Sequence, residues 1–529
     1  DQIGTQQPLI DGGGRQGAPL DWERTWTEVH QIRRALVLKN PLFDIGPLLL
    51  VKHVPSAMSH QLTQVYGYTA RPGGGIFVLD EPGKSMNARS LTEGRFPAGN
   101  FMHSDVSFDG KRVYFAFCEA ERSPERWRDP ATMDRYYHVY EMPAGGGSVR
   151  KLTEGRYDHF NPTCLPDGRM MLVSTRRGGY HRCGGGPCYV YTLTLMEPGG
   201  SSGAASDEAI YPVSFHETNE WDPTILNNGR ILYTRWDYVD RDAVFYQNLW
   251  TVRPDGTDVR IYFGNNTFAP NGIWESCAVP GTEKVVAIAG PHHGMSGGSV
   301  ILLDTSKGVD GAAPITRLTP DVRFPEAEVP LRHGIPLPAP TDFDSDSGRY
   351  WDANRQDRPA ERVSEAPEEE LRWGGHCYRS PYPLSEDYWI VSYSFDRLIG
   401  EPGPNLPNMF GIYFADRFGN KELIYRDPNI SSQWAKPLRG RVAPFALREN
   451  LPPRRAPREQ AGGKGTGTFY LQNVYESWPE LPAGDEDRIT HLRIVQVLPK
   501  TTPNANSPKV GEANASPAKQ VLGTVPVET

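Results

Sequence analysis

Short runs of alternating apolar and polar residues, each closed by a tight-turn signal, recur along most of this 529-residue chain. The clearest copies begin at Phe101, Phe160 and Trp221, and weaker ones begin near Trp274 and Cys377. The clear copies place Asp-Gly or Asn-Gly between two alternating strands, and these pairs supply the positive φ that tight hairpins need. A degenerate copy at 48–94 completes a set of about six units.

The repeat predicts an all-β protein with a six-bladed β-propeller over residues 39–440. Each unit reads as a four-stranded antiparallel sheet, and such a sheet cannot bury both of its faces alone. Radial packing of each sheet against its neighbours buries both faces. In that architecture the first strand of every unit lines a central channel.

The remaining segments depart from the repeat. Residues 1–20 are rich in Gly and Gln and are predicted to be disordered, whereas residues 21–38 predict a helix packed on the outside of the β domain. A Pro-, Asp- and Glu-rich insertion at 319–373 reads as a loop or lid, and 441–467 as a linker. Two strand patterns within 468–529 predict the start of a second, incomplete β-rich domain.

Composition and charge agree with this fold and exclude some partners. The chain has 54 Gly and 48 Pro, as expected for many short strands joined by turns. Its net charge of -8 is spread with both signs mixed, so we expect no nucleic-acid partner. The longest apolar run, at 45–51, is too short to cross a bilayer, so we expect no transmembrane segment.

Polar side chains recur at or just before the first strand of successive units. We expect them to converge near one mouth of the channel, where His and carboxylate groups can bind a metal or an anionic ligand. An equally favoured alternative is that they hydrogen-bond neighbouring blades together. The set comprises His103, Asp105, His159, Glu220, Asp222, Glu275 and His376.

A Gly-rich loop at 176–188 replaces a simple hairpin and carries His181, Cys183 and Cys188. His181 and Cys183 are ligand types that zinc prefers, although a lone Cys-x4-Cys lacks the second ligand pair of a zinc ribbon. In an oxidising compartment a Cys183–Cys188 disulfide is the alternative. A second Gly-flanked pair, His292 and His293, is expected in a solvated loop.

The familiar catalytic motifs are missing from the sequence. It has no Gly-x-Ser-x-Gly, no P-loop, no His-Glu-x-x-His and no dinucleotide fingerprint, so no catalytic residues are identified. It also lacks Cys-x-x-Cys-His, the attachment motif of c-type haem. No residue of this chain is therefore expected to hold haem.

Several motifs together resemble the hydrazine synthase α-subunit family. They include Ser-Thr-Arg-Arg-Gly-Gly-Tyr-His-Arg-Cys at 174–183, Arg-Ser-Pro-Tyr-Pro-Leu-Ser at 379–385, and Leu-Arg-Ile-Val-Gln-Val-Leu-Pro-Lys at 492–500. The resemblance implies a periplasmic protein with a TolB-like, WD40-like propeller, followed by a domain that carries c-type haem with a zinc ion nearby. Cys183 would match the family's propeller cysteine near the zinc. Haem is then expected only in a region beyond this sequence.

These observations lead to three hypotheses of function. The first is an exported scaffold or binding propeller that supports a C-terminal haem domain or a redox partner subunit and is catalytically incomplete as given. The second is a metal- and haem-dependent redox enzyme subunit of nitrogen metabolism, of the hydrazine synthase type. The third is a TolB-like module that binds another protein or a glycan. A shared propeller does not transfer an activity among them.

Overall fold

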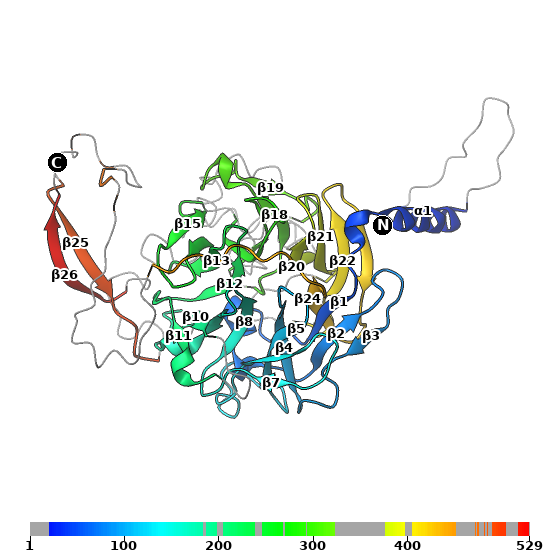
Figure 1. The fold of residues 1–529 in the computed structure, drawn as a ribbon, viewed down its shortest axis with the longest axis horizontal. Coiled ribbons are helices and arrows are strands. Elements are labelled where there is room, and N and C mark those ends of the chain that lie inside the picture. The colour runs from blue at the N-terminus through cyan, green and yellow to red at the C-terminus, as the bar shows by residue number, and fades with distance from the viewer. Residues whose placement is uncertain are drawn as a thin grey trace, which may run out of the picture.

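Six four-stranded antiparallel units surround a common centre in the computed structural model (Figure 1). The structure describes residues 21–183, 187–197, 205–238, 246–267, 270–292, 294–322, 376–396, 405–450, 471, 473–475, 481, 484, 489–503 and 517–527. The predictions for residues 1–20, most of the 319–373 insertion, most of the 441–467 linker and His293 fall outside the described residues. The prediction of a six-bladed propeller is confirmed.

Each blade contributes its strands in chain order from the channel outward, with one exception in blade 1. Blade 1 is β24 (Ser431–Pro437), β1 (Leu48–His53), β2 (Gly74–Leu79) and β3 (Ala88–Ser90); blade 2 is β4 (Gly99–Val106), β5 (Arg112–Glu119), β6 (His138–Pro143) and β7 (Arg150–Lys151). Blade 3 is β8 (His159–Cys164), β9 (Met170–Ser174), β10 (Thr192–Met196) and β11 (Ile210–Pro212).

The other three blades follow the same order. Blade 4 is β12 (Glu220–Ile225), β13 (Ile231–Trp236), β14 (Gln247–Val252) and β15 (Arg260–Phe263); blade 5 is β16 (Gly272–Ala278), β17 (Val285–Gly290), β18 (Ser299–Leu303) and β19 (Ile315–Arg317). Blade 6 is β20 (Cys377–Pro383), β21 (Tyr388–Ser394), β22 (Gly411–Asp416) and β23 (Lys421–Tyr425). A single parallel pairing of Gln247 with Gly272 links blades 4 and 5.

Blade 1 closes the ring. Its innermost strand, β24, comes from the end of the propeller sequence and pairs antiparallel with β1 from its beginning. The copy of the repeat at 48–94 therefore supplies only three strands, which explains why it reads as degenerate in the sequence. Its missing inner strand is β24, which begins almost 380 residues after the end of β1.

Every inner strand carries a β-bulge at an equivalent position. The pairing of each inner strand with its neighbour shifts register once, and a non-Gly residue with positive φ stands at or beside each shift. A bulge bends the strand and re-aims a side chain, and six copies aim six side chains into the channel. These residues are His103, Asn161, Asp222, Glu275, Ser380 and Trp434, all with φ between 47° and 51°.

The core fills the spaces between blades. One large cluster of buried residues includes Trp236, Trp274 and Trp389, and smaller clusters join neighbouring blades. Burial of such large rings on both faces of every sheet is the radial packing that the repeat predicts. Short 3-10 helices occupy several connections: η1 (Pro41–Phe43), η2 (Gln61–Gln64), η3 (Gly67–Thr69), η4 (Thr175–Arg177), η5 (Asp207–Ala209) and η6 (Thr305–Lys307).

The predicted leading helix is present as α1 (Trp22–Val37), but it does not pack as expected. None of its residues is buried, and Trp22 and Trp26 are more than half exposed. Only the last turns of the helix touch the propeller. Arg33 pairs with Glu422 (2.8 Å), Arg34 donates to the carbonyl of Leu423 (2.7 Å), and Val37 packs against a buried cluster of blades 1 and 6. The expectation that its apolar stripe covers the β domain is wrong, and α1 projects away from the propeller (Figure 1).

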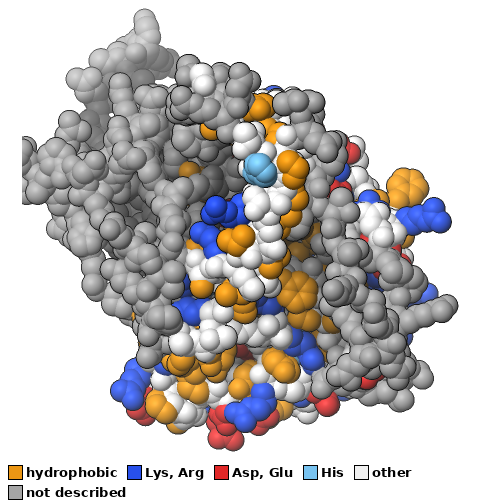
Figure 2. All heavy atoms as spheres, turned by 90° about the vertical axis from the view of Figure 1, so that its left-hand side faces the viewer, with side chains coloured by type: hydrophobic (Ala, Val, Ile, Leu, Met, Phe, Trp, Pro, Cys, Tyr) orange, Lys and Arg blue, Asp and Glu red, His pale blue; other side chains and the backbone are white. Residues whose placement is uncertain are grey.

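A further β-rich unit follows the propeller. Strands β25 (His491–Val497) and β26 (Lys519–Pro526) form a two-stranded antiparallel ribbon. It lies at the side that faces the viewer in Figure 2, where hydrophobic side chains are scattered among polar ones. No helix in the described parts of the chain is long and apolar enough to cross a membrane.

Candidate metal centre and channel ring

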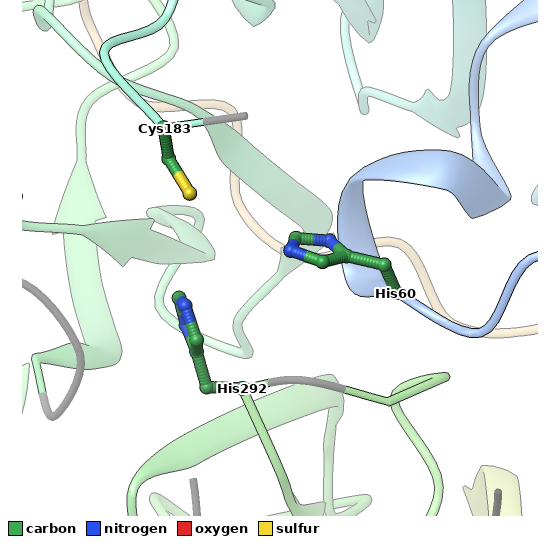
Figure 3. Close-up of side chains that lie close together, drawn as sticks. All are labelled: His60, Cys183 and His292. Carbon is green, nitrogen blue, oxygen red and sulfur yellow. The ribbon is translucent and has the colours of Figure 1, made fainter. Parts of the chain in front are cut away.

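Three potential metal ligands converge beside the channel. His60, Cys183 and His292 each offer one ligand atom, and these atoms lie within 4.8 Å of one another. Figure 3 shows the thiol and the two imidazole rings pointing toward a common centre. Both histidines are buried, and Cys183 is half-buried. Two imidazoles and a thiolate are ligand types that zinc prefers, so these three residues could hold a zinc ion and would leave room for one further ligand.

The three residues of this metal triad occupy equivalent connections in alternate blades. His60 lies between β1 and β2, Cys183 between β9 and β10, and His292 between β17 and β18. In blades 1, 3 and 5 respectively, each connection joins the second strand from the channel to the third. All three connections emerge at the same end of the propeller, because the blades share one strand order. This shared position explains how residues 60, 183 and 292 meet.

His60 is held by the start of η2. The Leu62 backbone N–H donates to Nδ1 of His60 (3.0 Å), so the neutral ring carries its hydrogen on Nε2. If Nε2 held a metal, Nδ1 would carry the hydrogen and the Leu62 contact would be lost, at a cost of about 1 kcal/mol. Structural zinc sites contribute about 10–16 kcal/mol, so this contact does not oppose binding.

His292 lies against two glutamine amides. Nε2 of Gln61 is 3.3 Å from Nδ1 of His292, and the amide of Gln247 contacts the same nitrogen. Oε1 of Gln61 has no hydrogen-bond partner among the described residues. For Nε2 of His292 to keep a lone pair for a metal, Nδ1 would have to carry the hydrogen, and the Gln61 and Gln247 amides would have to turn their oxygens toward it. The surroundings of His292 thus fit a metal ligand. The expectation of a solvated loop at His292 is wrong, because its side chain is buried.

His181 positions the Cys183 loop and is not one of the three ligands. Nδ1 of His181 accepts a hydrogen bond from the Cys183 backbone N–H (2.8 Å), and its ring packs on Trp236 with centroids 4.6 Å apart. Burial, followed by the nearby Arg182 guanidinium, lowers the pKa of His181 to about 3. His181 therefore stays neutral at physiological pH and acts as a hydrogen-bond acceptor that orients the loop.

The two cysteines of the loop, Cys183 and Cys188, have different neighbours. Both are free thiols in the structure, and the Cys183–Cys188 disulfide stays a prediction for an oxidising compartment. Cys188 is buried with its Sγ 3.2 Å from the hydroxyl of Tyr66, and burial raises the pKa of its thiol to about 11. Cys188 is a packing residue, whereas Cys183 faces two imidazoles.

The channel ring consists of the six bulge residues of the inner strands. Asn161 donates to Asp222 (2.8 Å), and the backbone N–H of Glu275 donates to the other oxygen of Asp222 (2.9 Å). Glu275 in turn accepts from Arg379 (3.0 Å) and from the indole N–H of Trp434 (3.1 Å). Of the residues expected at the channel, His103, Asp222 and Glu275 belong to this ring. The ring thus combines blade-to-blade hydrogen bonds with side chains that face open space.

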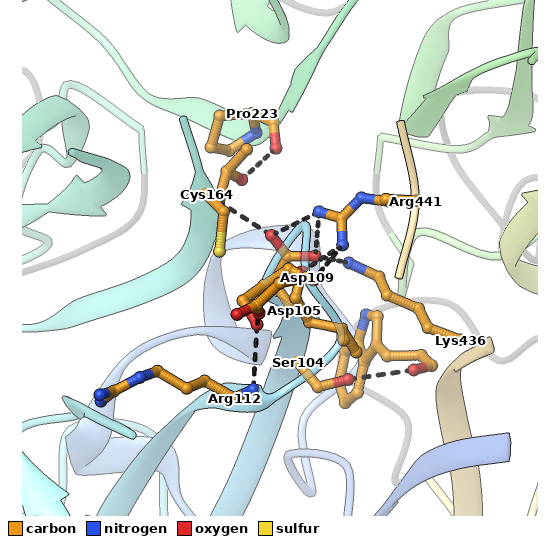
Figure 4. A network of polar contacts seen from close by, with 12 residues as sticks. Ser104, Asp105, Asp109, Arg112, Cys164, Pro223, Lys436 and Arg441 are labelled. Carbon is orange, nitrogen blue, oxygen red and sulfur yellow. Dashed lines mark hydrogen bonds and ion pairs between the residues drawn. The ribbon is translucent and has the colours of Figure 1, made fainter. Parts of the chain in front are cut away.

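Asp105 has a structural role at the closure of the ring. Its carboxylate accepts from Lys436 (3.0 Å), from Arg441 (3.2 Å) and from the backbone N–H of Cys164 (2.9 Å), as Figure 4 shows. These contacts join blades 1, 2 and 3. Lys436 and Arg441 keep the pKa of Asp105 well below its usual range despite burial. Asp105 does not approach the metal triad.

His159 and Glu220 lie two residues before the bulges and point between blades. Nε2 of His159 accepts from Arg176 (3.0 Å), and burial holds the pKa of His159 well below its usual value. Glu220 accepts from the Leu193 backbone (2.9 Å) and the Ser214 hydroxyl (2.7 Å). Burial raises the pKa of Glu220 to about 7. Glu220 thus joins blades 3 and 4, whereas the hydrogen bond of His159 to Arg176 stays within blade 3.

His376 lies at the entry to blade 6. Its Nδ1 is 2.9 Å from the hydroxyl of Tyr393 and its Nε2 is 3.1 Å from the carbonyl of Asp321. It is not one of the three residues of the metal triad, and it lines neither of the two cavities described next. The six residues proposed from sequence as metal ligands thus separate into five different surroundings, and only Cys183 enters the triad.

Two cavities lie on opposite sides of the channel ring. The smaller, about 350 Å³, is bounded by Gln61 and Gln64 of η2, next to the metal triad. The larger, about 590 Å³, lies on the other side. His103, Asp222 and Trp434 line both cavities, so the ring forms the partition between them.

Sequence reasoning missed His60 and underrated His292. His60 belongs to the degenerate copy of the repeat and lies near no motif, and the Gly-flanked pair that includes His292 was interpreted as a solvated loop. One signal was available. Superposing the units places His60, Cys183 and His292 in the same connection of alternate copies. A ligand set split over three loops is visible only when the repeat is read in register.

Comparison with known proteins supports the fold. No family model matches the chain, and no curated protein matches it. Among solved structures, hydrazine synthase from Kuenenia stuttgartiensis superposes with a TM-score of 0.53 at 15% identity, over 76% of this chain and 48% of that one. TolB from Acinetobacter baumannii gives 0.36 at 13% identity, over 80% of this chain and 74% of that one. The chain therefore spans about half the length of the hydrazine synthase chain that it resembles.

Proposed function

We propose that this chain is the propeller of an exported redox protein, in which it acts as a scaffold that holds a zinc ion at the metal triad. The observation that carries the proposal is the convergence of His60, Cys183 and His292 from alternate blades. Two buried imidazoles and a half-buried thiol, with ligand atoms within 4.8 Å of one another, form a ligand set of the kind that zinc prefers. The wider likeness to the hydrazine synthase propeller supports the scaffold role.

A zinc ion held by the three residues of the metal triad would have one coordination site left for a group from another molecule. A zinc ion with three protein ligands binds water or a group from another molecule at its remaining site. We propose that this group comes from a C-terminal haem domain or a redox partner subunit, and that the protein works in the periplasm. In this proposal the residues of this chain supply the metal site and the channel, and the haem belongs to the partner.

A second candidate is a redox enzyme subunit of the hydrazine synthase type. The same triad favours it, because an open zinc position can polarise a bound substrate. A TolB-like module that binds protein or glycan is a third candidate, favoured by the channel mouth alone. The three differ in what the metal does: the scaffold needs it for assembly, the enzyme needs it for turnover, and the binding module does not need it.

Metal analysis of the purified chain tests the proposal. We expect about one zinc per chain under reducing conditions, and none in Cys183→Ser or His292→Ala. Cys188→Ser is the matched control, because its thiol lies in the same loop but contacts Tyr66. His181→Ala should weaken binding without abolishing it. Cobalt substitution should give a thiolate charge-transfer band that Cys183→Ser removes.

Two outcomes would overturn this assignment. Zinc retained in Cys183→Ser and His292→Ala would place the metal elsewhere. A wild-type chain that binds no zinc, cobalt or copper at micromolar concentration would leave the triad as packing. Copper with a thiolate absorption band would keep the site but replace the metal, since a His2Cys set also suits copper.

A further inference from the structure

The larger cavity of the channel is built by the repeat itself. Each of the six inner strands contributes residues at its bulge or directly after it, so the wall has six nearly equivalent segments. The residues come from β4, β8, β12, β16, β20 and β24. Its floor is the channel ring. This site is separate from the metal triad, whose three residues do not line the cavity.

The floor presents polar atoms that have no partner. Nδ1 of His103 and Oγ of Ser276 are buried and make no hydrogen bond to any described residue, and both side chains line the cavity. His103 is 7% exposed and Ser276 is 5% exposed. Oδ1 of Asn161 also makes no hydrogen bond to any described residue. The amide nitrogen of the same side chain donates to Asp222, which fixes the direction in which Oδ1 points. Buried polar atoms without partners are unfavourable, so a ligand that hydrogen-bonds to them is stabilised.

The two carboxylates of the floor are not equivalent. Glu275 accepts from Arg379, from the Ser380 backbone and hydroxyl, and from Trp434, so its lone pairs are occupied. Asp222 accepts only two hydrogen bonds and has no ion pair within the described residues. Asp222 is thus the carboxylate with free acceptor capacity. Burial, then the neighbouring Glu275, raises the pKa of Asp222 to about 6, so it is mainly ionised at pH 7.5.

Part of the wall above the floor is apolar. Pro162, Pro223 and Pro381 follow the bulges of β8, β12 and β20, and Ala435 follows that of β24. Proline is tolerated here because the inner strand is the free edge of each blade and needs no hydrogen bond on the channel side. Tyr382 adds an aromatic surface. The cavity therefore has an acceptor-rich floor. Its wall combines this apolar part with the polar side chains of Ser104, Thr163, Thr224 and Lys436, and the Lys436 ammonium pairs with Asp105 (3.0 Å).

We propose that this cavity binds a small organic primary amine, with its ammonium group on the ring and its carbon chain along the proline wall. The N–H groups of a primary ammonium match the acceptors Asp222, Asn161 and Ser276, and the positive charge matches the unpaired carboxylate. A bare alkali ion would leave the apolar part of the wall unused and would gain little from the His103 nitrogen. An anion would meet Asp222, so the charge of the floor excludes it.

Titration with n-butylammonium chloride tests this inference. Saturable binding at pH 7.5, followed by calorimetry or ligand-observed NMR, is expected for the wild type. Asp222→Asn keeps the shape of the side chain but removes its charge, and should weaken binding about 10- to 100-fold, the range for one charge-assisted hydrogen bond. Glu93→Gln, an exposed carboxylate outside the channel, is the control and should bind like the wild type.

Two further ligands separate charge from shape. Neutral n-butanol fills the same wall without a charge, and tetramethylammonium has the charge without N–H donors. Both should bind at least about tenfold more weakly than n-butylammonium. Equal binding of either compound, equal binding by Asp222→Asn, or no saturable binding by the wild type would overturn the proposal.

Other variants guard against misfolding and keep the two sites apart. Ser276→Ala removes one unsatisfied hydroxyl without touching the ring's hydrogen bonds, and should weaken amine binding by a few fold while the melting temperature stays close to that of the wild type. Unchanged amine binding by Ser276→Ala and Asp222→Asn together would overturn the assignment. Cys183→Ser should lose zinc but keep amine binding, and Asp222→Asn should do the reverse, so failure of one site is distinguishable from failure of the other.

Discussion

The channel ring and the metal triad lie at successive levels of the same channel, but the chain builds them differently. The ring takes one residue from every blade at one position of the inner strand. The triad takes one residue from every second blade, in connections whose lengths vary. Gln61 connects the ring to the triad, since it lines the smaller of the two cavities and also contacts His292. A repeat therefore fixes the geometry of the strands, while its connections are free to acquire chemistry.

The largest effect is expected where the ring is closed. Asp105→Ala leaves Lys436 and Arg441 without their carboxylate and should lower the free energy of unfolding by about 3 kcal/mol. This is the lower end of the range for buried pairs, because both cations keep part of their side chains in water. Urea unfolding measures it, with Glu93→Ala as control. Zinc per folded chain should not change; if it falls, the ring and the triad are not independent.

A smaller effect is expected at the triad. Gln61→Ala removes the amide beside Nδ1 of His292 and should weaken zinc binding about 10- to 100-fold, as is typical for groups that orient a metal ligand. Competition with a chelator measures the affinity. Gln496→Ala on the β25–β26 ribbon serves as control. An unchanged affinity would show that Gln247 alone orients the ring of His292.

The link between the triad segment and blade 3 is expected to depend on pH. Asp158 accepts from the backbone N–H groups of Gly67 (3.0 Å) and Tyr137 (2.9 Å), and burial raises its pKa to about 7. Because the pKa in the folded state exceeds that of an unfolded aspartate, the stability contributed by Asp158 is fully present below about pH 4 and is lost as the pH rises through 7.

The Asp158→Asn variant separates the pH-dependent stability contributed by Asp158 from that of the other titrating groups. The amide oxygen still accepts both N–H groups but does not titrate. The wild type should lose about 1–3 °C more than the variant in melting temperature between pH 6 and pH 8. Calorimetric scans at both pH values provide the measurement. Equal losses in the two proteins would contradict the raised pKa, since Glu220 titrates in both.

The smallest effect concerns the left-handed backbone of the ring. Asn161 has φ of 50°, a conformation that Asn and Gly adopt more readily than other residues. Asn161→Ala should therefore be less stable than Asn161→Gly by about 1 kcal/mol. Both variants lose the same hydrogen bond to Asp222, so the difference reports the backbone alone. Chemical denaturation of the two variants side by side provides the test.

The strands and the ring could be predicted from sequence to different depths. Alternation and Asp-Gly turns are local signals, and they identified the blades correctly because the propeller uses the same signals six times. The ring needed the register of each bulge as well. Glu220 and Asp222 were expected at the channel together, but the bulge turns only Asp222 inward and leaves Glu220 between blades.

The triad and the leading helix show where local signals end. His60 carries no motif, and its meeting with Cys183 depends on the superposition of blades 1 and 3, which is a property of the whole ring. The apolar stripe of α1 was identified correctly as helical, but periodicity does not say what covers it. Arg33 and Arg34 attach the end of the helix to blade 6. This contact could not be predicted from the sequence, because Glu422 lies almost 390 residues further along the chain.

The strand exchange that closes blade 1 also sets the order of events during synthesis. Strand β1 leaves the ribosome roughly 20–75 s before its partner β24, at the usual 5–20 residues per second over the almost 380 residues between them. Throughout that interval the channel-side edge of β1 is unpaired and can join strands of other chains. Protection of this nascent edge, rather than the stability of any finished blade, is therefore expected to limit the yield of folded protein.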